Sequence, residues 1–405
     1  MKILVLNSGS SSQKSCLYEI GAELPPDPPP CLWQGKIEWQ GDTGSVAIRS
    51  SHGASLNQHV KITSRGQAIE YLMGTLWKGE ASAVGSPSEV DVVGHRVVHG
   101  GPQYENPVRI TSQVKAAIVR LAEFAPLHNR AELDSMNMVE KLFGPVPQIA
   151  VFDTGFHQTI SRAAAVYPGP YEWFSSGIRR YGFHGINYRY CCGRAAQLLG
   201  RDPSSLRLVA CHLGNGCSLA AIRNGKSVDT TMGFTPLEGL MMGTRSGSVD
   251  PGILTYLMRQ GGLSAQQLDQ VLNTQSGLLG ISGRSGDMRD ILTAMKEGDE
   301  RATLAFDIYI HRLQSGIGSM IGVLGGLDAL VFSGGVGENS PEVRAGACEN
   351  FGFLGIKLDA AKNAQSPPDA NLAAPESSVP VLIIRAQEDW QIARECWALA
   401  SRGDS

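Results

Sequence analysis

The order of apolar and polar positions along the chain predicts a sheet near its start. Residues 2–20 carry an apolar run, a polar stretch and a second apolar run, which predicts a strand, a loop and another strand. Alternating apolar positions predict further strands at 31–39, 45–50 and 57–62. The first part of the chain is therefore expected to be rich in strands.

Longer segments with a helical period follow this strand-rich start. Their apolar spacing predicts three helices, at 66–77, 114–125 and 128–144. Two apolar runs lie among them, at 90–101 and 146–157, and predict buried strands that end in polar loops. Strands that alternate with helices in this way favour an α/β architecture.

The second half of the chain begins again in the same style. Residues 206–231 predict a strand, a polar loop, a strand, a turn and a strand, and residues 327–344 predict a strand, a glycine-rich loop and a helix. The remaining segments predict helices at 251–260, 264–272 and 300–325, and a strand that leads into a helix at 379–400. Residues 4–20 and 208–222 share a strand, a loop with Asn and Gly, and a return strand, which indicates two related halves.

Composition narrows the class of protein. The chain has 405 residues, of which 42% are hydrophobic and 18% charged, as in soluble globular proteins of two or three domains. No apolar run reaches the length of about 18 residues that predicts a membrane-spanning helix. The net charge of −3 gives no basic footprint for nucleic acid or an anionic membrane surface. None of the eight cysteines forms a CxxC pair, so we expect reduced thiols in a cytoplasmic protein.

Three glycine-rich segments that follow apolar strands indicate anion binding. They lie at 7–14, 212–216 and 333–339. One such segment alone is better explained by a plain turn. Three in one chain favour anion binding, because backbone N–H groups in loops of this kind hold anions and Lys14 adds a positive charge to the first. None matches the P-loop or the dinucleotide-binding pattern. We therefore expect residues 7–14 to form a phosphate-binding hairpin.

Carboxylates stand where predicted strands end. Asp153 follows one apolar run, and Glu388 and Asp389 follow another. Oxygen ligands of this kind suit Mg²⁺, which keeps several of its waters. The alternative is an acid exposed to solvent or one at a helix N-terminus, and for Asp389 the two interpretations are about equal.

Arginine and histidine also occur among glycines. Arg96 and Arg245 together could hold an anionic acceptor because a guanidinium group binds carboxylate or phosphate oxygens bidentately, although each arginine alone is better explained by a surface ion pair. His184 lies among small residues where a donor can reach a ligand, or it is structural. His95 and His99 lie in a strand-like run without a HExxH motif, so we expect no zinc site there.

Taken together and in order, these motifs resemble those of the acetate kinase family. The stretches that carry the resemblance are LNSGSSSQK, GHRVVHGG, PLHN, FDTGFH, YGFHG, HLGNG, TPLEGLMMGTRSGSVDPG, SGRSGDMRD, SGGVGENSPEVR and QEDWQIARE. The resemblance implies two duplicated domains of the actin-like ATPase (ribonuclease H-like) fold, with a nucleotide cleft between them. The expected domains are 1–155 with 389–405, because the C-terminal helix packs back on the first domain, and 156–388.

The resemblance also assigns site residues. It implies that Asn7 and Glu388 hold Mg²⁺, or Mn²⁺ in its place, and that Lys14 lies near the ATP phosphates. The implied catalytic residues are Asp153, His184, Arg245 and Arg96, of which Arg96 binds the acceptor carboxylate. The implied acyl pocket is formed by Val98, Leu127, Phe183 and Pro236. The implied nucleotide-binding residues are His212, Leu213, Gly214, Asn215, Gly216, Asp287, Met288, Arg289, Gly335, Val336, Gly337, Glu338 and Asn339.

Three segments depart from the family pattern. The segment LPPDPPP at 24–30 lies outside the motifs and is expected to be a surface loop. Arg284 and Gly286 stand where smaller or hydroxyl residues are more usual. The C-terminal motif is RAQED rather than TNEE, which keeps the acid at Glu388 and leaves Asp389 less secure.

The expected reaction is ATP plus acetate giving ADP plus acetyl phosphate, and its reverse, in a homodimer. An acceptor carboxylate with a pKa of about 4–5 is already ionised at neutral pH, so no general base is required and Asp153 is expected to orient other groups. Kinases for propionate or butyrate are the first alternative. A sugar kinase, with Asp153 as a true base, and a non-catalytic actin-like nucleotide-binding protein are the others.

Overall fold

The computed structural model describes residues 1–9, 12–121 and 126–402, and at 126–128 only the backbone. The chain divides into two compact units, one formed by Met1–Phe156 with Gln387–Ser405 and the other by His157–Ala386. These boundaries lie within two residues of those expected from the sequence.

The first unit is built on an eight-stranded sheet with the order β5-β4-β3-β2-β1-β6-β8-β7. Its strands are β1 (Lys2–Ser8), β2 (Ser12–Glu19), β3 (Trp33–Gln40), β4 (Thr43–Ser50), β5 (Ser55–Lys61), β6 (Val92–Val97), β7 (Val108–Arg109) and β8 (Gln148–Phe152). The strands β1, β6 and β8 run parallel, so their carboxyl ends meet at one edge of the sheet. The strands β1 to β5 form an antiparallel meander.

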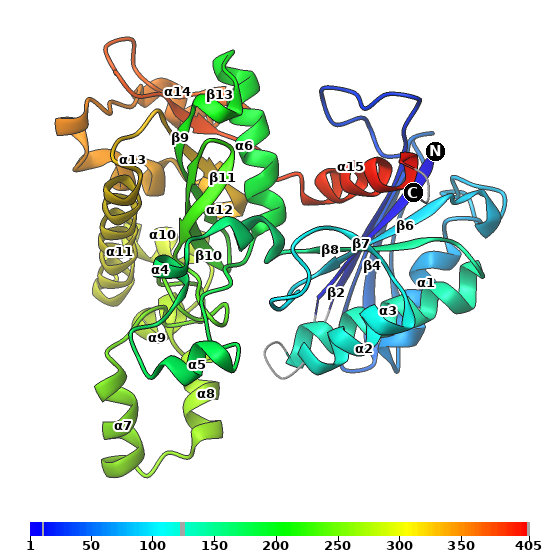
Figure 1. The fold of residues 1–405 in the computed structure, drawn as a ribbon, viewed down its shortest axis with the longest axis horizontal. Coiled ribbons are helices and arrows are strands. Elements are labelled where there is room, and N and C mark those ends of the chain that lie inside the picture. Colours follow the sequence, from blue (N-terminus) through cyan, green and yellow to red (C-terminus); the bar gives the residue numbers. More distant parts are fainter. Residues whose placement is uncertain (10–11, 122–125, 403–405) are drawn as a thin grey trace. The chain divides into compact units, whose positions relative to one another are not determined.

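Helices cover both faces of this sheet (Figure 1). The helices α1 (Arg65–Gly74), α2 (Ser112–Leu121) and α3 (Pro126–Phe143) lie on one face, and α15 (Glu388–Ser401) lies on the other. Burial on both faces explains why β1 and β8 are apolar along nearly their whole length rather than at alternate positions. The C-terminal helix thus belongs to the first unit.

The second unit repeats the central strand arrangement. Its sheet has the order β11-β10-β9-β12-β14-β13. The strands are β9 (Arg207–Leu213), β10 (Cys217–Arg223), β11 (Lys226–Thr230), β12 (Ala329–Ser333), β13 (Ala370–Asn371) and β14 (Val381–Ile383). The hairpin β9–β10 is antiparallel, as the hairpin β1–β2 is in the first unit. The strands β9, β12 and β14 run parallel, as β1, β6 and β8 do in the first unit. The similarity seen between 4–20 and 208–222 therefore corresponds to equivalent hairpins.

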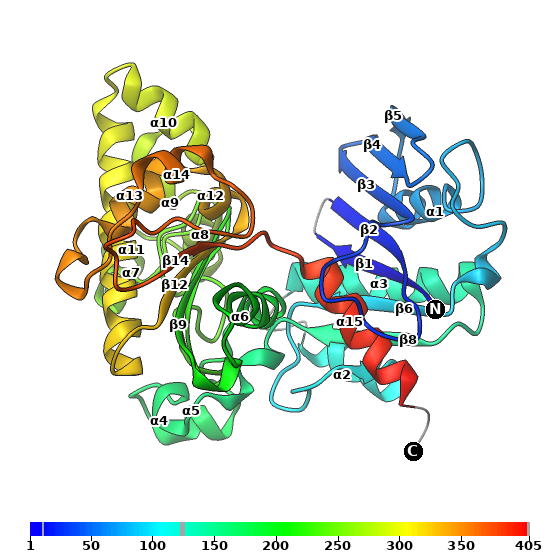
Figure 2. The same cartoon turned by 90° about the horizontal axis from the view of Figure 1, so that it is seen from above.

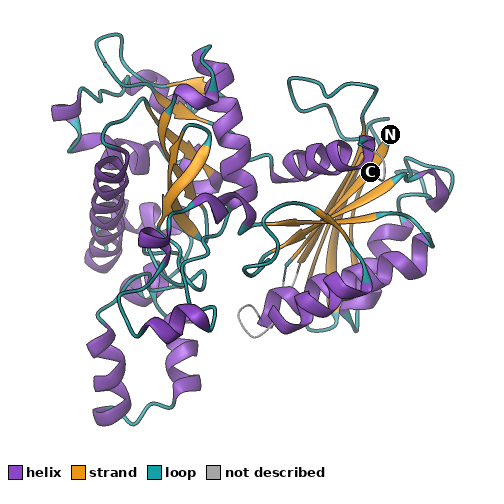
Figure 3. Cartoon of the chain, in the orientation of Figure 1, coloured by secondary structure: helices purple, strands orange, loops and turns teal. Residues whose placement is uncertain are grey.

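Helices α6 (Gly185–Leu199) and α11 (Glu300–Leu324) cover opposite faces of the second sheet (Figure 2). The remaining helices surround them (Figure 3) and are α4 (Arg162–Ala165), α5 (Tyr171–Ser175), α7 (Pro251–Gln260), α8 (Ala265–Thr274), α9 (Gly277–Ser282), α10 (Met288–Lys296), α12 (Gly334–Asn339), α13 (Pro341–Glu349) and α14 (Ala360–Gln365). Short 3₁₀ helices lie at Pro87–Glu89, Gly155–Thr159, Pro203–Ser205 and Gly352–Leu354. In the described part of the chain, no helix has both the length and the apolar character needed to cross a membrane.

Two glycine-rich segments differ from the sequence expectation. Residues 334–339 form the short helix α12 and not a loop, although glycine disfavours helices. Side-chain hydrogen bonds hold this helix, because the buried Arg344 side chain donates from Nη1 to the carbonyl groups of Gly337 and Glu338, at 2.8 and 2.9 Å. In the first hairpin, Asn7 extends β1 and Ser12 begins β2, so only residues 9–11 separate the strands, and residues 10–11 lie outside the described part.

Candidate active site

In the first unit, three predicted site residues meet where the parallel strands end. Asn7 lies in β1, Arg96 in β6, and Asp153 directly follows β8. The Arg96 side chain donates from Nε and Nη2 to Asp153 Oδ2, at 3.1 and 2.5 Å, and from Nη1 to Asn7 Oδ1 at 3.2 Å. These bonds use three of the five N–H donors of the guanidinium group. Two donors can therefore serve an anionic ligand.

The surroundings of Arg96 keep it charged. Burial disfavours the guanidinium cation, but the negative charges of Asp153 and Glu388 outweigh this effect and raise the pKa of Arg96 above its ordinary value. Asp153 is 1% exposed and its position is fixed by this ion pair. A carboxylate held by two N–H groups of one arginine is a poor proton acceptor, because protonation would cost the ion pair.

The predicted metal-binding acids lie in the first turn of α15. Asp389 Oδ2 accepts a hydrogen bond from the Cys16 thiol at 3.6 Å, and Asp389 Oδ1 is buried with no hydrogen-bond partner in the described part of the chain. Burial and the neighbouring Glu388 charge raise the pKa of Asp389, while Lys14 and Arg96 oppose the shift. A buried carboxylate oxygen that lacks a donor fits a hard cation, which takes oxygen ligands.

Lys14 lies beside this acidic end. It stands opposite Asn7 in the pairing of β1 with β2, and its side chain is exposed. The positive charge of Lys14 is close enough to lower the pKa of Asp389. The end of the hairpin provides an amide oxygen from Asn7 and an ammonium group from Lys14, and the first turn of α15 provides carboxylates. This set of groups suits a metal-bound phosphate.

The residues predicted to form the acyl pocket come from both units. Val98 follows β6 in the first unit and is buried, with 4% of its surface exposed. Phe183 and Pro236 belong to the second unit. Leu127 begins α3, but its side chain lies outside the described residues. A pocket formed by these four residues therefore stays a prediction.

In the second unit, His184 has a constrained position before α6. Its backbone is left-handed, with φ of 58°, which costs a non-glycine residue about 1–3 kcal/mol. Its Nδ1 lies 2.9 Å from Ser218 Oγ, and its ring stacks on His212 with the ring centroids 4.1 Å apart. These contacts orient the Nε2 edge of the ring. Strain of this kind, held by the surrounding contacts, is typical of functional sites.

Arg245 approaches the same place as His184. Its Nη1 donates to the Pro236 carbonyl at 2.6 Å. A Cβ atom at Gly216 would lie 2.5 Å from Arg245 Nη2, so the glycine makes room for the guanidinium group, and His184 Nε2 lies at contact distance, 3.6 Å from the same point. Burial lowers the pKa of Arg245, and no carboxylate in the described residues forms an ion pair with it. A half-buried guanidinium group without a carboxylate partner is well suited to bind an anion.

A cavity of about 560 Å³ in the second unit joins three of the predicted nucleotide segments. The predicted residues that line it are Gly214, Asn215, Asp287, Met288, Arg289, Gly335, Val336 and Asn339. The other lining residues were not predicted to bind the nucleotide, and they are Leu278, Gly286, Leu292, Tyr309 and Ser340. Gly286 and Ser340 lie within the quoted motifs SGRSGDMRD and SGGVGENSPEVR. Leu278, Leu292 and Tyr309 lie on helices outside the motifs, so only their helical burial pattern could have suggested them.

Other predicted nucleotide residues do not line this cavity. Leu213 is fully buried behind it, and His212 stacks on His184. Glu338 Oε1 accepts hydrogen bonds from the backbone N–H groups of Gly334 and Ala386, both at 2.9 Å. The side chain of Glu338 therefore holds the β12–α12 turn against the end of the second unit.

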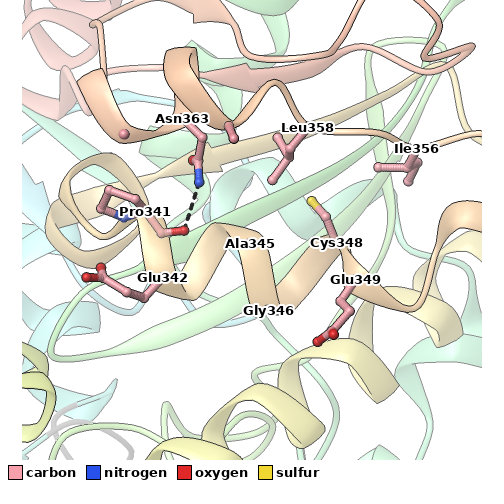
Figure 4. Close-up of a pocket in the computed structure, with 11 residues that line it drawn as sticks. Pro341, Glu342, Ala345, Gly346, Cys348, Glu349, Ile356, Leu358 and Asn363 are labelled. Atoms are coloured by element: carbon pink, nitrogen blue, oxygen red, sulfur yellow. Dashed lines mark hydrogen bonds between the residues drawn. The ribbon is translucent and has the colours of Figure 1, made fainter. Parts of the chain in front are cut away.

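A second hollow in this unit contains none of the predicted residues. It has a volume of about 640 Å³ and lies between α13 and residues 356–364 (Figure 4). Asn363 Nδ2 donates to the Pro341 carbonyl at 2.9 Å across one end, and the side chains of Glu342 and Glu349 are acidic. Acidic side chains and the absence of any cation among its lining residues make it unsuitable for a nucleotide phosphate.

The geometry can be compared with known proteins. The model of the acetokinase family matches residues 2–394. The chain belongs to the acetokinase family. It is 59% identical to the acetate kinase of Cyanothece sp. over 401 residues, which cover 98% of each chain. It is 57% identical to the acetate kinase of Trichormus variabilis over 405 residues, which cover 99% of this chain and 100% of the relative.

Solved structures of the family have the same fold. Acetate kinase from Porphyromonas gingivalis matches with a TM-score of 0.90 and 40% identity over 98% of this chain and 99% of that one. A propionate kinase from Francisella tularensis matches with a TM-score of 0.89 and 36% identity over the same shares. The resemblance drawn from the motifs and the α/β fold that it implied are thereby confirmed.

Proposed function

We propose that this protein transfers a phosphoryl group reversibly between ATP and acetate, by direct in-line transfer, giving ADP and acetyl phosphate. The observation that carries the proposal is a pair of half-buried arginines among small residues in a chain of the acetokinase family. Arg96 keeps two donors for an anion, and Arg245 has no carboxylate partner in the described residues. Phosphoryl transfer relies mainly on such positioning and charge neutralisation.

The proposed roles follow from charge. Arg96 binds the acceptor carboxylate, while Arg245 and His184 stabilise the oxygens of the transferring phosphoryl group. Asp153 holds the Arg96 guanidinium through Nε and Nη2 and does not abstract a proton. A sugar kinase would need Asp153 as a base for a neutral hydroxyl group, and the ion pair with Arg96 opposes that role.

Mg²⁺ would be held by Asn7 and Glu388, with Asp389 beside them. Magnesium usually binds proteins through one or two carboxylates and the substrate phosphates, and it neutralises phosphate charge. Mn²⁺ has the same preference for oxygen ligands. Lys14 adds its charge to the phosphate side of this site. The nucleoside of ATP or ADP would occupy the cavity of about 560 Å³ in the second unit.

Acetate is the proposed acceptor because the relatives from Cyanothece sp. and Trichormus variabilis are named acetate kinases. The propionate kinase at 36% identity keeps propionate as the second candidate, since the same chemistry serves either acid. Butyrate would need a deeper pocket still. The size of the acyl pocket, to which we assign Val98, Leu127, Phe183 and Pro236, decides among these acids.

The test is to trap the product. Purified protein with Mg-ATP and one short acid at a time would be treated with hydroxylamine, which converts acyl phosphates to coloured hydroxamates. We expect acetate to give the highest kcat/KM, with propionate lower and butyrate lowest. A protein that prefers propionate would keep the kinase chemistry and lose the acetate assignment. A protein that phosphorylates glucose or glycerol and no acid would refute the proposed reaction.

The assembly proposed is a cytoplasmic homodimer. All eight cysteines are free thiols, which suits a reducing compartment. The helix α7 contains no buried residue, although Ile253 and Tyr256 lie three positions apart on it and are 47% and 60% exposed. Residues at this spacing share one face of a helix, and an exposed apolar face suits a contact with a second copy of the chain.

A further inference from the structure

Glu132 is a buried acid beside the proposed acceptor site that no motif indicates. It lies on α3 with 1% of its surface exposed. Its Oε1 accepts a hydrogen bond from the backbone N–H of Val98 at 3.0 Å. Its Oε2 is buried and has no hydrogen-bond partner in the described part of the chain. The side chain thus holds the backbone two residues after Arg96, where β6 ends.

The charged groups that face Glu132 come from three neighbouring elements. Arg96 faces it from β6, Arg65 from α1, and Asp153 from the residue after β8. Burial raises the pKa of Glu132 to about 8; Arg96, the Val98 N–H and Arg65 oppose the rise, and Asp153 adds to it. A carboxyl group with that pKa is about nine-tenths protonated at pH 7. Glu132 is therefore neutral under ordinary conditions.

We propose that Glu132 is a positioning residue for the acceptor carboxylate: as a neutral acid it anchors the Val98 backbone and leaves the charge of Arg96 to the substrate. The inference rests on the proposed role of Arg96. Asp153 already offsets much of the Arg96 charge through the ion pair at 2.5 Å. A second buried anion next to Arg96 would repel the acceptor, whereas a neutral carboxyl group supports the strand end without that cost.

The proposal predicts that the protonation state of Glu132 changes the binding of the acceptor and leaves turnover nearly unchanged. Ionisation of Glu132 places a negative charge near the acceptor carboxylate and strengthens rather than breaks the bond from the Val98 N–H. The acceptor should then bind more weakly while the phosphoryl-transfer groups stay in place. If only the enzyme with protonated Glu132 binds acetate, KM for acetate rises about tenfold between pH 7 and pH 9. The KM for ATP and the kcat should change much less.

The decisive variant is Glu132→Gln. Glutamine keeps an oxygen that accepts from the Val98 N–H and cannot ionise in this range. We expect its KM for acetate at pH 7 to lie within about threefold of the wild-type value and to stay flat up to pH 9. Asp134→Asn is the matched control, because Asp134 is an exposed acid on the same helix. This control should keep the wild-type rise in KM.

Stability supplies a readout that does not depend on activity. Glu132 titrates near pH 4.3 in the unfolded chain and near pH 8 in the folded one, so the folded state binds more protons between these values. The contribution of Glu132 to stability is therefore full below about pH 4 and is lost as pH rises to about 8. We expect the thermal midpoint of the wild type to fall relative to that of Glu132→Gln across this window.

The outcomes are distinguishable. A wild-type KM for acetate that stays flat from pH 7 to 9.5 would overturn the proposal, even if the glutamine variant fails to fold. Parallel KM profiles or parallel thermal midpoints for wild type and Glu132→Gln would overturn it as well. If the wild type forms no acyl phosphate at any pH, the proposed function fails. The difference in thermal midpoint between wild type and Glu132→Gln still shows whether Glu132 is protonated in the folded protein.

Discussion

At the scale of single residues, the clearest feature is the convergence of Arg245 and His184 on Gly216. A Cβ atom at that position would lie 2.5 Å from Arg245 Nη2 and 3.6 Å from His184 Nε2. We propose that the two groups act on charge that develops during the reaction. Their contribution should therefore be seen in turnover and not in folding.

Arg245→Ala is expected to lower kcat by about 10²-fold or more, because it removes a proposed donor to the transferring phosphoryl group. His184→Ala should have an effect of similar size. Steady-state kinetics with acetate and ATP measure both. Arg259→Ala removes an exposed arginine on α7 and is the control, with kinetics unchanged. A normal kcat with only KM raised would show that Arg245 binds substrate and does not stabilise the transition state.

Val98→Ala should change the choice of acid. We place the Val98 side chain against the acyl group, so removing two methyl groups should lower KM for propionate and narrow the preference for acetate. One methylene group is worth about 1–3 kcal/mol in such a pocket, so the preference itself should be about 10- to 200-fold. Val97→Ala is the matched control, because Val97 packs in the core with Ile118. An unchanged ratio of kcat/KM for the two acids in Val98→Ala would remove Val98 from the pocket.

At the scale of elements, α15 connects the end of the chain to the site. It packs on the sheet of the first unit and presents Glu388 and Asp389 in its first turn. The C-terminal residues thereby return to the unit that contains Asn7 and Lys14. The position of the helix therefore brings acids from the end of the sequence next to residues from its start.

Glu388→Ala should need a much higher Mg²⁺ concentration for half-maximal rate, because it removes a proposed ligand. Mn²⁺ in place of Mg²⁺ would allow binding to be measured directly by electron paramagnetic resonance. Glu395→Ala lies two turns further along α15 and should leave the metal dependence unaltered. If Asp389→Asn shifts the curve and Glu388→Ala does not, the ligand is Asp389.

At the scale of the whole molecule, the exposed face of α7 predicts association. The chain has a mass of 43.3 kDa, and sedimentation should show a species of twice that mass. Tyr256→Arg places a charge in the proposed contact and should shift the protein towards the single chain at micromolar concentration. Phe353→Arg replaces another exposed apolar residue, 80% accessible, away from α7 and should leave the dimer intact. Association that survives Tyr256→Arg would place the interface elsewhere.

The sequence by itself determined most elements and the residues at the strand ends. The continuous apolar runs of β1 and β8 and the helical periods of α2 and α11 were legible because burial on two faces or on one stripe leaves a direct pattern in the chain. Asp153 could be singled out because it follows such a run, Arg96 because it lies among glycines, and Asn7 because its motif resembles that of the family. Their convergence in the first unit needed only the parallel order of three strands.

Tertiary structure decided what depends on contacts between distant residues. The glycine-rich segment of α12 is held in a helix by Arg344, which donates to the carbonyl groups of Gly337 and Glu338. Glu132 looks like an ordinary helix acid in the sequence, and its importance comes from the hydrogen bond to Val98, 34 residues away. Similarly, only folding selected which nucleotide-motif residues line the cavity and which, like Glu338, hold the backbone. Periodicity records which face of a segment is buried, but it carries no information about the group that the face will meet.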